Sequence, residues 1–159
     1  MTDPTILEAV SQHPFVQGMS GEHCAMLADL AHHASFARGD VIFAEGDERH
    51  EFFLLLSGRV ALEMNLQGKP FRLHTVEAGD EIGWSAVLMG RGKHFQARAL
   101  EPVEALAFDG YALLQKCRDD NAFGYKIMHR MLGVVSDRLQ AARVQIMDTY
   151  SPVAKKAGA

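Results

Sequence analysis

The sequence predicts an α+β domain: an antiparallel β-roll of the jelly-roll (double-stranded β-helix) kind, with an N-terminal helix and a C-terminal helical pair that includes one long helix. Two observations support this fold class. Residues 34–108 consist of short apolar segments separated by glycine-bearing turns. Residues 122–149 follow one amphipathic helical pattern with no internal proline. The length of 159 residues suits one domain with an appendage.

The elements follow in order along the chain. The spacing of apolar residues predicts a helix over 20–32, with Ser20 as its N-cap and Glu22 in its first turn. Seven strand-like segments come next, at 34–38, 41–44, 51–56, 59–64, 70–76, 94–100 and 103–108. In the fourth segment Val60, Leu62 and Met64 alternate with Ala61 and Glu63, which predicts a strand with one face on a core.

The C-terminal part predicts two helices and a dimer. Asp109 is expected to cap a helix over 110–120, and Pro152 to end the long helix over 122–149. Apolar residues recur along the long helix at alternating intervals of four and three, the heptad spacing of a coiled-coil seam. The seam residues are Met128, Leu132, Val135, Leu139, Ala142 and Ile146. We expect a parallel homodimer through this seam; the alternative is a helix folded back on its own roll.

These elements predict a division of the chain into a roll with flanking short helices (1–121), a dimerisation helix (122–149) and a flexible tail (150–159).

Composition excludes several classes of function. The net charge of −4 argues against a broad nucleic-acid-binding surface. The chain shows no secretory leader and no apolar run that could cross a bilayer, so we expect a cytoplasmic protein without membrane contact. Cys24 and Cys117 lack metal or disulfide spacing and are expected to be buried free thiols.

No catalytic or metal site is predicted. The eight histidines include no His-x-His pair, and His32 and His33 are expected to diverge on the first helix. The sequence also lacks a nucleophile elbow, a phosphate-binding Walker loop and a Cys-His nucleophile spacing. We therefore expect a protein that is not an enzyme.

Three linked motifs resemble those of the cyclic nucleotide-binding domain family, in its catabolite-activator-type effector form. The first is the run 39–47 (GDVIFAEGD), followed by Phe53, Leu55, Gly58 and Val60. The second is 79–83 (GDEIG) with the short helical run 84–88 (WSAVL), which is similar to the family's phosphate-binding cassette. The third is the strand-like 97–100 (ARAL), and together the resemblance covers about residues 15–147.

The resemblance implies a roll that holds a cyclic nucleotide and helices that move on binding, so that another domain or protein is signalled. Only ten residues follow Thr149, too few for the helix-turn-helix of the family's transcription activators. We therefore expect no direct sequence-specific DNA reading, and an output through a protein partner.

The cassette backbone is suited to an anion, because a glycine turn into a helix start presents free N–H groups. Gly83, Ser85 and Ala86 would supply this geometry. The resemblance implies that cyclic AMP binders place a glutamate after the Gly83 position, for the ribose hydroxyl. Here that position holds Trp84, which cannot accept a hydrogen bond.

The family's phosphate-binding arginine aligns with Lys93, or with Arg91 if the loop shifts; the third alternative is that neither residue takes this role. Lysine pairs with phosphate as a point charge and not as a two-pronged fork, so ordinary cyclic AMP binding should be weakened. Trp84 is interpreted either as a plug in an abandoned pocket or as an aromatic floor for a different small molecule.

Three hypotheses follow. The first is a regulatory sensor in which a small anionic ligand or a partner at the cassette shifts the hinge at 109–121 and changes what the helix dimer presents. The second is a ligand-free interaction scaffold. The third is a genuine cyclic AMP or cyclic GMP regulator with a rearranged site using Ser85 and Lys93 or Arg91.

Overall fold

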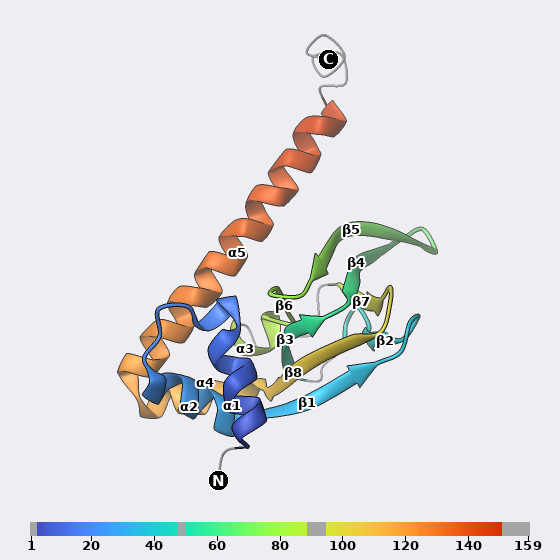
Figure 1. The fold of residues 1–159 in the computed structure, drawn as a ribbon. Helices are drawn as coiled ribbons and strands as arrows, with labels where there is room; N and C mark the ends of the chain where they lie inside the picture. The colour runs from blue at the N-terminus through green and yellow to red at the C-terminus, as the bar shows by residue number, and fades with distance from the viewer. Residues whose placement is uncertain (1–2, 48–49, 89–94, 151–159) are drawn as a thin grey trace.

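A computed structural model describes residues 3–47, 50–88 and 95–150. In these residues two antiparallel four-stranded sheets form the roll, with strand orders β1-β8-β3-β6 and β2-β7-β4-β5 (Figure 1). The strands are β1 Ala31–Phe36, β2 Val41–Phe43, β3 Glu51–Ser57, β4 Arg59–Leu66, β5 Lys69–Glu77, β6 Glu81–Ile82, β7 Gln96–Ala99 and β8 Val103–Asp109. The helices are α1 Pro4–Gln12, a 3-10 turn η1 Pro14–Val16, α2 Gly21–Leu30, α3 Ser85–Leu88, α4 Gly110–Asp119 and α5 Asn121–Tyr150. The predicted fold class is confirmed.

The strand β3 explains why the apolar run in this part of the sequence is unbroken. Phe53 and Leu55 belong to the core between the two sheets. Phe52 and Leu54 belong to a second core, which lies between the first sheet and the helices. A strand buried on both faces needs apolar side chains at successive positions, because neighbouring residues point to opposite faces.

Helix caps and one tight turn behave as the sequence predicts. The Ser20 hydroxyl accepts from the backbone N–H of His23 at 3.1 Å, and the Asp109 carboxylate from that of Tyr111 at 2.9 Å. Gly58, between β3 and β4, has φ +89°, and a Cβ there would lie 2.3 Å from the carbonyl oxygen of Pro102. Only glycine fits this position.

The predicted extent of the first helix is wrong. α2 ends at Leu30, and His32 and His33 lie on β1, which pairs antiparallel with β8 from Ala31 opposite Phe108 onward. This pairing, with a strand more than 70 residues away in the sequence, outweighs the local helical pattern.

The prediction that β4 has one face on a core is confirmed, and its other face is covered as well. Val60 and Leu62 do face the core between the sheets. On the other face Ala61 is fully buried and Glu63 is 8% exposed. Glu63 is covered because Gln96, its neighbour on β7, and Arg98 fold over it.

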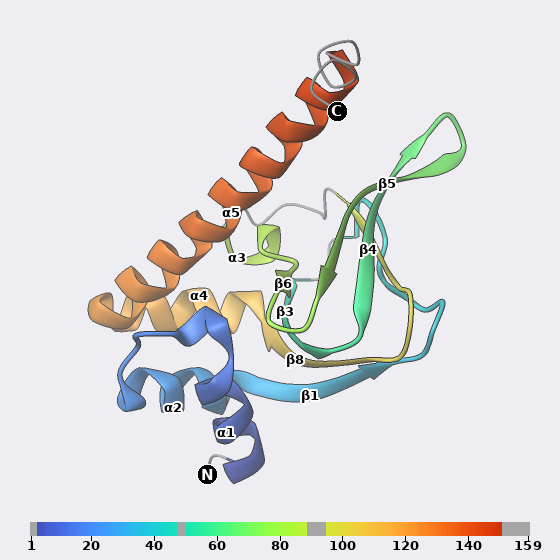
Figure 2. The same cartoon turned by 45° about the horizontal axis from the view of Figure 1, so that its top comes forward.

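The helix α5 combines an anchored half and a projecting half. Phe123, Ile127 and Met131 are fully buried in the helical core. Gly124 lies where α5 meets α4, since a Cβ there would be 2.5 Å from the carbonyl oxygen of Cys117. Beyond this region α5 extends past the roll (Figures 1 and 2). None of the helices formed by the described residues is long and apolar enough to span a membrane.

The two cysteines behave as predicted: Cys24 and Cys117 are buried free thiols. Burial raises the pKa of Cys117 to about 11, so this thiol stays protonated at neutral pH.

Candidate functional site

The candidate site is the cassette, residues 79–88, which joins β5 to α3 through β6. Gly79 and Gly83 both have positive φ, +93° and +82°. The turn at Asp80 is closed by its carboxylate, which accepts from the backbone N–H of Glu77 at 2.9 Å. Two backbone hydrogen bonds tie the cassette to Leu55 of β3. The N–H of Leu55 donates to the Asp80 carbonyl at 2.9 Å, and the Leu55 carbonyl accepts from the N–H of Gly79 at 3.0 Å.

A buried histidine ties the N-terminal helical segment to the same point of β3. His13 is 4% exposed, and its Nε2 lies 3.0 Å from the Leu55 carbonyl oxygen. Its Nδ1 accepts from the backbone N–H of Phe15 at 3.1 Å, so we assign the proton to Nε2. Burial lowers the pKa of His13, which keeps the ring neutral at neutral pH.

The structure brings four of the predicted ligand-binding residues together. Gly83 is buried, Ser85 is 5% exposed at the start of α3, and Ala86 follows within α3. Trp84 is half-buried directly before α3, and its carbonyl accepts from the N–H groups of Val87 and Leu88, at 3.1 Å each. The other two predicted residues, Arg91 and Lys93, lie outside the described residues.

Trp84 packs against the core between the helices and the first sheet, the core that contains Phe123, Ile127 and Met131 of α5. The tryptophan therefore connects the cassette to the helical layer, and the indole reports on that contact.

A second connection between cassette and α5 runs through Arg138. Its Nη2 donates to the backbone carbonyl of Glu81 at 2.8 Å. Arg138 comes one helical turn after Val134, the last buried residue of α5, so it extends the anchored face. Further along the same face, the Gln145 amide donates to the carbonyl of Leu73 on β5.

The groups around Arg138 have perturbed pKa values. Burial raises the pKa of the Glu81 carboxyl to about 7, against the opposing attraction of Arg138. Burial lowers the pKa of Arg138, and burial together with the positive charge of Arg138 lowers that of His74 on β5. A cavity of about 340 Å³ adjoins this cluster, between the cassette and α5, with Asp80, Glu81 and Asp137 in its lining.

The predicted dimerisation residues occupy a face of α5 beside the anchored one. Leu132, Leu139 and Ile146 are 67%, 62% and 57% exposed, and Ala142 is exposed as well. Met128 and Val135 are half-buried, and Met128 packs against the helical core. The seam is therefore available to another surface along most of its length.

Sequence reasoning missed His13, Glu81 and Arg138. One signal was present: Arg138 interrupts the apolar positions of α5 at the spacing of Val134 and Met131. For His13 and Glu81 no local pattern marks the role, because each acts on a partner distant in the sequence. No group of three or more His, Cys, Asp or Glu residues that could hold a metal ion occurs within 3–47, 50–88 and 95–150.

The chain is similar to a known domain family in its sequence and to several solved structures in its fold. The sequence model of the cyclic nucleotide-binding domain matches residues 33–120. A putative cyclic nucleotide-binding protein from Geobacter metallireducens GS-15 is 26% identical, with a TM-score of 0.74 over 87% of this chain and 99% of that one. A cyclic nucleotide-binding domain from Methylobacillus flagellatus KT is 22% identical, with a TM-score of 0.79 over 91% of this chain and 82% of that one. The Thermus thermophilus catabolite activator protein is 23% identical, with a TM-score of 0.71 over 84% of this chain and 61% of that one.

Proposed function

This chain belongs to the cyclic nucleotide-binding domain family, and we propose that it is a non-enzymatic regulatory module in which α5 transmits the state of the cassette to a partner protein. The observation that carries this proposal is the bond from Arg138 of α5 to the Glu81 carbonyl of the cassette, 2.8 Å long. A displacement of β6 moves the acceptor of this bond. The bond therefore couples the cassette to the helix that projects from the domain.

One further contact and one cavity support the coupling between the cassette and α5. Trp84 packs on the core that anchors α5. The cavity of about 340 Å³ between the cassette and α5 leaves space into which either element can shift. A packed interface without such space would resist the movement that signalling requires.

We propose that the cassette does not accept cyclic AMP in the family's usual way. The position that holds a glutamate in good cyclic AMP binders holds Trp84, whose indole offers a donor and no acceptor. Ser85, buried beside Gly83, remains as a hydroxyl partner for a different small anion. The ligand we propose is therefore a small anionic molecule other than a tightly held cyclic AMP.

The test uses Trp84, the one tryptophan of the chain, as the reporter. Cyclic AMP and cyclic GMP are titrated while the intrinsic fluorescence is followed, with calorimetry as an independent reading. We expect no saturable response at micromolar nucleotide. Saturable binding at micromolar concentration in both assays would show a working cyclic nucleotide site and reject the altered-cassette proposal.

A ligand-free scaffold is a second candidate, favoured by the packing of Trp84 against the helical core. Mass spectrometry of the small molecules released on denaturing the purified protein separates the two. Release of an anionic molecule in a one-to-one ratio with the protein would reject the scaffold. If no such molecule is released and no member of a library of anionic metabolites binds the protein, the sensor is rejected.

We propose that α5 forms a parallel homodimer through the seam Met128, Leu132, Val135, Leu139, Ala142 and Ile146. The exposed side chains of Leu132, Leu139 and Ile146 support this, since burying apolar surface yields about 25 cal/mol per Å². Sedimentation velocity of Leu139→Asp should show a monomer. Val144→Asp is the matched control, because Val144 is also exposed but lies about 140° around the helix. A dimeric Leu139→Asp variant would contradict the seam.

A further inference from the structure

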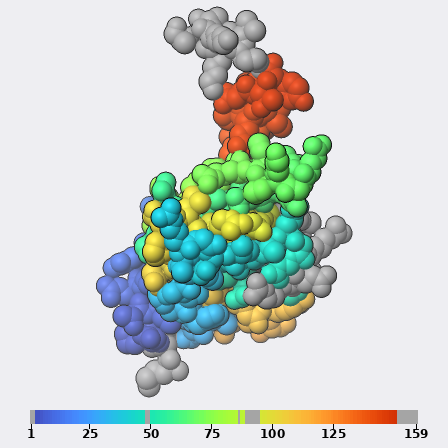
Figure 3. Space-filling view, turned by 90° about the vertical axis from the view of Figure 1, so that its right-hand side faces the viewer, coloured from blue at the N-terminus to red at the C-terminus, as the bar shows by residue number. Residues whose placement is uncertain are grey.

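A pocket of about 290 Å³ lies where the turn after η1 meets the first turns of α5 (Figures 1 and 2). Its lining comes from residues 17–19 of that turn and, on α5, from Tyr125, Lys126, His129 and Arg130. The pocket therefore lies near the start of the helix. The opposite end of α5 is the part that rises above the roll, drawn in red in Figure 3.

The charged side chains that line this pocket carry the same sign. Lys126 and Arg130 contribute two positive charges, and none of the described lining residues is an aspartate or a glutamate. The two cations are four residues apart on α5, a spacing at which like charges on a helix repel each other. Helix stability alone would favour an acidic residue at one of these positions, so the pair calls for another explanation.

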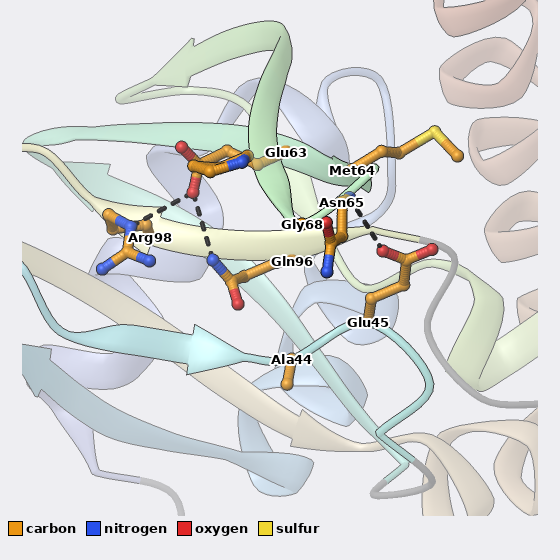
Figure 4. Close-up of a pocket in the computed structure, with 9 residues that line it drawn as sticks. Ala44, Glu45, Glu63, Met64, Asn65, Gly68, Gln96 and Arg98 are labelled. Atoms are coloured by element: carbon orange, nitrogen blue, oxygen red, sulfur yellow. Dashed lines mark hydrogen bonds and ion pairs between the residues drawn. The ribbon is translucent and has the colours of Figure 1, made fainter.

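Arg130 is half-buried, yet within the described residues its guanidinium has no hydrogen-bond or ion-pair partner. Two other arginines in residues 3–47, 50–88 and 95–150 are half-buried, and both have an acceptor. Arg98 pairs with Glu63 at 3.1 Å (Figure 4). Arg138 donates to the Glu81 carbonyl at 2.8 Å. Because a shielded charge without an acceptor costs free energy, the position of Arg130 favours an acceptor supplied by a ligand.

The guanidinium of Arg130 lies on the pocket side of the helix. A Cβ built on Gly18 would be 3.6 Å from Nη2 of Arg130, so the guanidinium lies against the turn that lines the pocket. Gly18 has φ +83°, which favours a residue without a side chain at this place. Asp80 and Asp137 line the neighbouring cavity of about 340 Å³, which Arg130 also borders, but neither carboxylate pairs with Arg130.

We propose that this pocket binds a phosphate monoester. Its charge of about −1.5 to −2 at neutral pH matches the two positive charges of the lining. The guanidinium of Arg130 would donate two N–H groups to the phosphate oxygens, and Lys126 would act as a point charge. The Gln17 amide and the Tyr125 hydroxyl add neutral donors. A single carboxylate, with one negative charge, would leave one of the two cations uncompensated.

The pocket is separate from the cassette and from the seam of α5. Lys126 and Arg130 each lie two residues from Met128 of the seam, about 160° around the helix, so the seam faces away from the pocket. Residues 79–81 of the cassette line the cavity of about 340 Å³ but not this pocket. The inference therefore does not depend on the function proposed for the cassette.

An NMR titration of the ¹⁵N-labelled full chain tests the site. The probes are glycerol 3-phosphate, the peptide acetyl-Gly-phosphoserine-Gly-amide, and the methyl diester of glycerol 3-phosphate, which has a single negative charge. We expect saturable shifts of the backbone amides of residues 17–19 and 125–130 with the monoesters, and binding of the diester about tenfold weaker. Tighter binding of the peptide would assign the phosphate to a partner protein, and tighter binding of glycerol 3-phosphate to a small molecule.

Three outcomes of this titration would overturn the proposal. They are the absence of saturation with both monoesters, equal binding of the diester, and shifts confined to residues 83–86 of the cassette.

Variants locate the contact. Lys126→Gln and Arg130→Gln should each weaken binding of the monoesters about tenfold, because each removes one of the two positive charges. The side chain of Lys126 is exposed, so Lys126→Gln reports on binding even if Arg130→Gln impairs folding. Arg143→Gln is the control, since Arg143 is an exposed arginine of α5 outside the pocket. Unchanged affinity in Lys126→Gln, or an equal loss in Arg143→Gln, would contradict this assignment.

Discussion

Replacing Glu81 by glutamine should make the folded domain more stable at alkaline pH relative to the natural chain. The surroundings of this carboxyl raise its pKa from 4.5 to about 7, because burial outweighs the attraction of Arg138, and Asp80 and Asp137 add repulsion. A folded-state pKa above the unfolded value means that the folded chain holds the proton more tightly. The stability contributed by the protonated carboxyl is full below about pH 4.5 and is lost as pH rises through 7.

The rise from 4.5 to about 7 corresponds to about 3 kcal/mol, at about 1.4 kcal/mol per pH unit. We reduce this to about 2 kcal/mol because a half-buried carboxylate keeps part of its hydration. Glu81→Gln cannot ionise and keeps a similar shape. The free energy of unfolding of the natural chain should therefore fall by about 2 kcal/mol relative to Glu81→Gln between pH 4.5 and pH 8.

Urea denaturation followed by circular dichroism, repeated across this pH range, measures the difference. Glu77→Gln, at an exposed position of β5 close to the same turn, should run parallel to the natural chain. Parallel curves for the natural chain and Glu81→Gln would refute the argument, because they would mean that Glu81 is solvated as in the unfolded chain.

Three further changes test the packing that positions the site. Gly58→Ala should destabilise the domain by about 3 kcal/mol or more in urea denaturation, because the new Cβ would lie 2.3 Å from the Pro102 carbonyl oxygen and φ is +89°. Asp109→Ala removes the acceptor for the Tyr111 N–H and should cost about 1 kcal/mol in the same assay, whereas Asp109→Asn should cost less. Phe123→Ala empties a fully buried position in the core that anchors α5 and should lower the free energy of unfolding by about 3–5 kcal/mol.

Local chemistry made much of the fold predictable. Ser20 and Asp109 are recognisable as caps from the sequence, because an N-cap needs only a short acceptor before a helical pattern. Gly58 marks a turn in the sequence, because glycine tolerates positive φ. Gly83 and Ser85 are assigned to one site because a glycine turn leads there into the start of a short helix, and Gly83 has positive φ directly before the helix that begins at Ser85.

Features that depend on distant pairing were not predictable in this way. The start of β1 at Ala31 is set by β8, and the burial of Glu63 is set by Gln96 and Arg98 on β7. The contact between Arg138 and Glu81 joins residues 57 positions apart. A single sequence carries the local propensities of these residues but not the register that brings them together.

The central claim is that α5 and the cassette are coupled through Arg138, and hydrogen–deuterium exchange tests it most directly. Arg138→Met keeps most of the apolar stem and removes the donor to Glu81, while Arg143→Met changes an exposed arginine of the same helix. We predict faster exchange in Arg138→Met at residues 79–88 and in α5 beyond Val134, with β1 and β8 unchanged and no effect of Arg143→Met. Unchanged exchange of residues 79–88 in Arg138→Met would contradict the coupling and the regulatory function built on it.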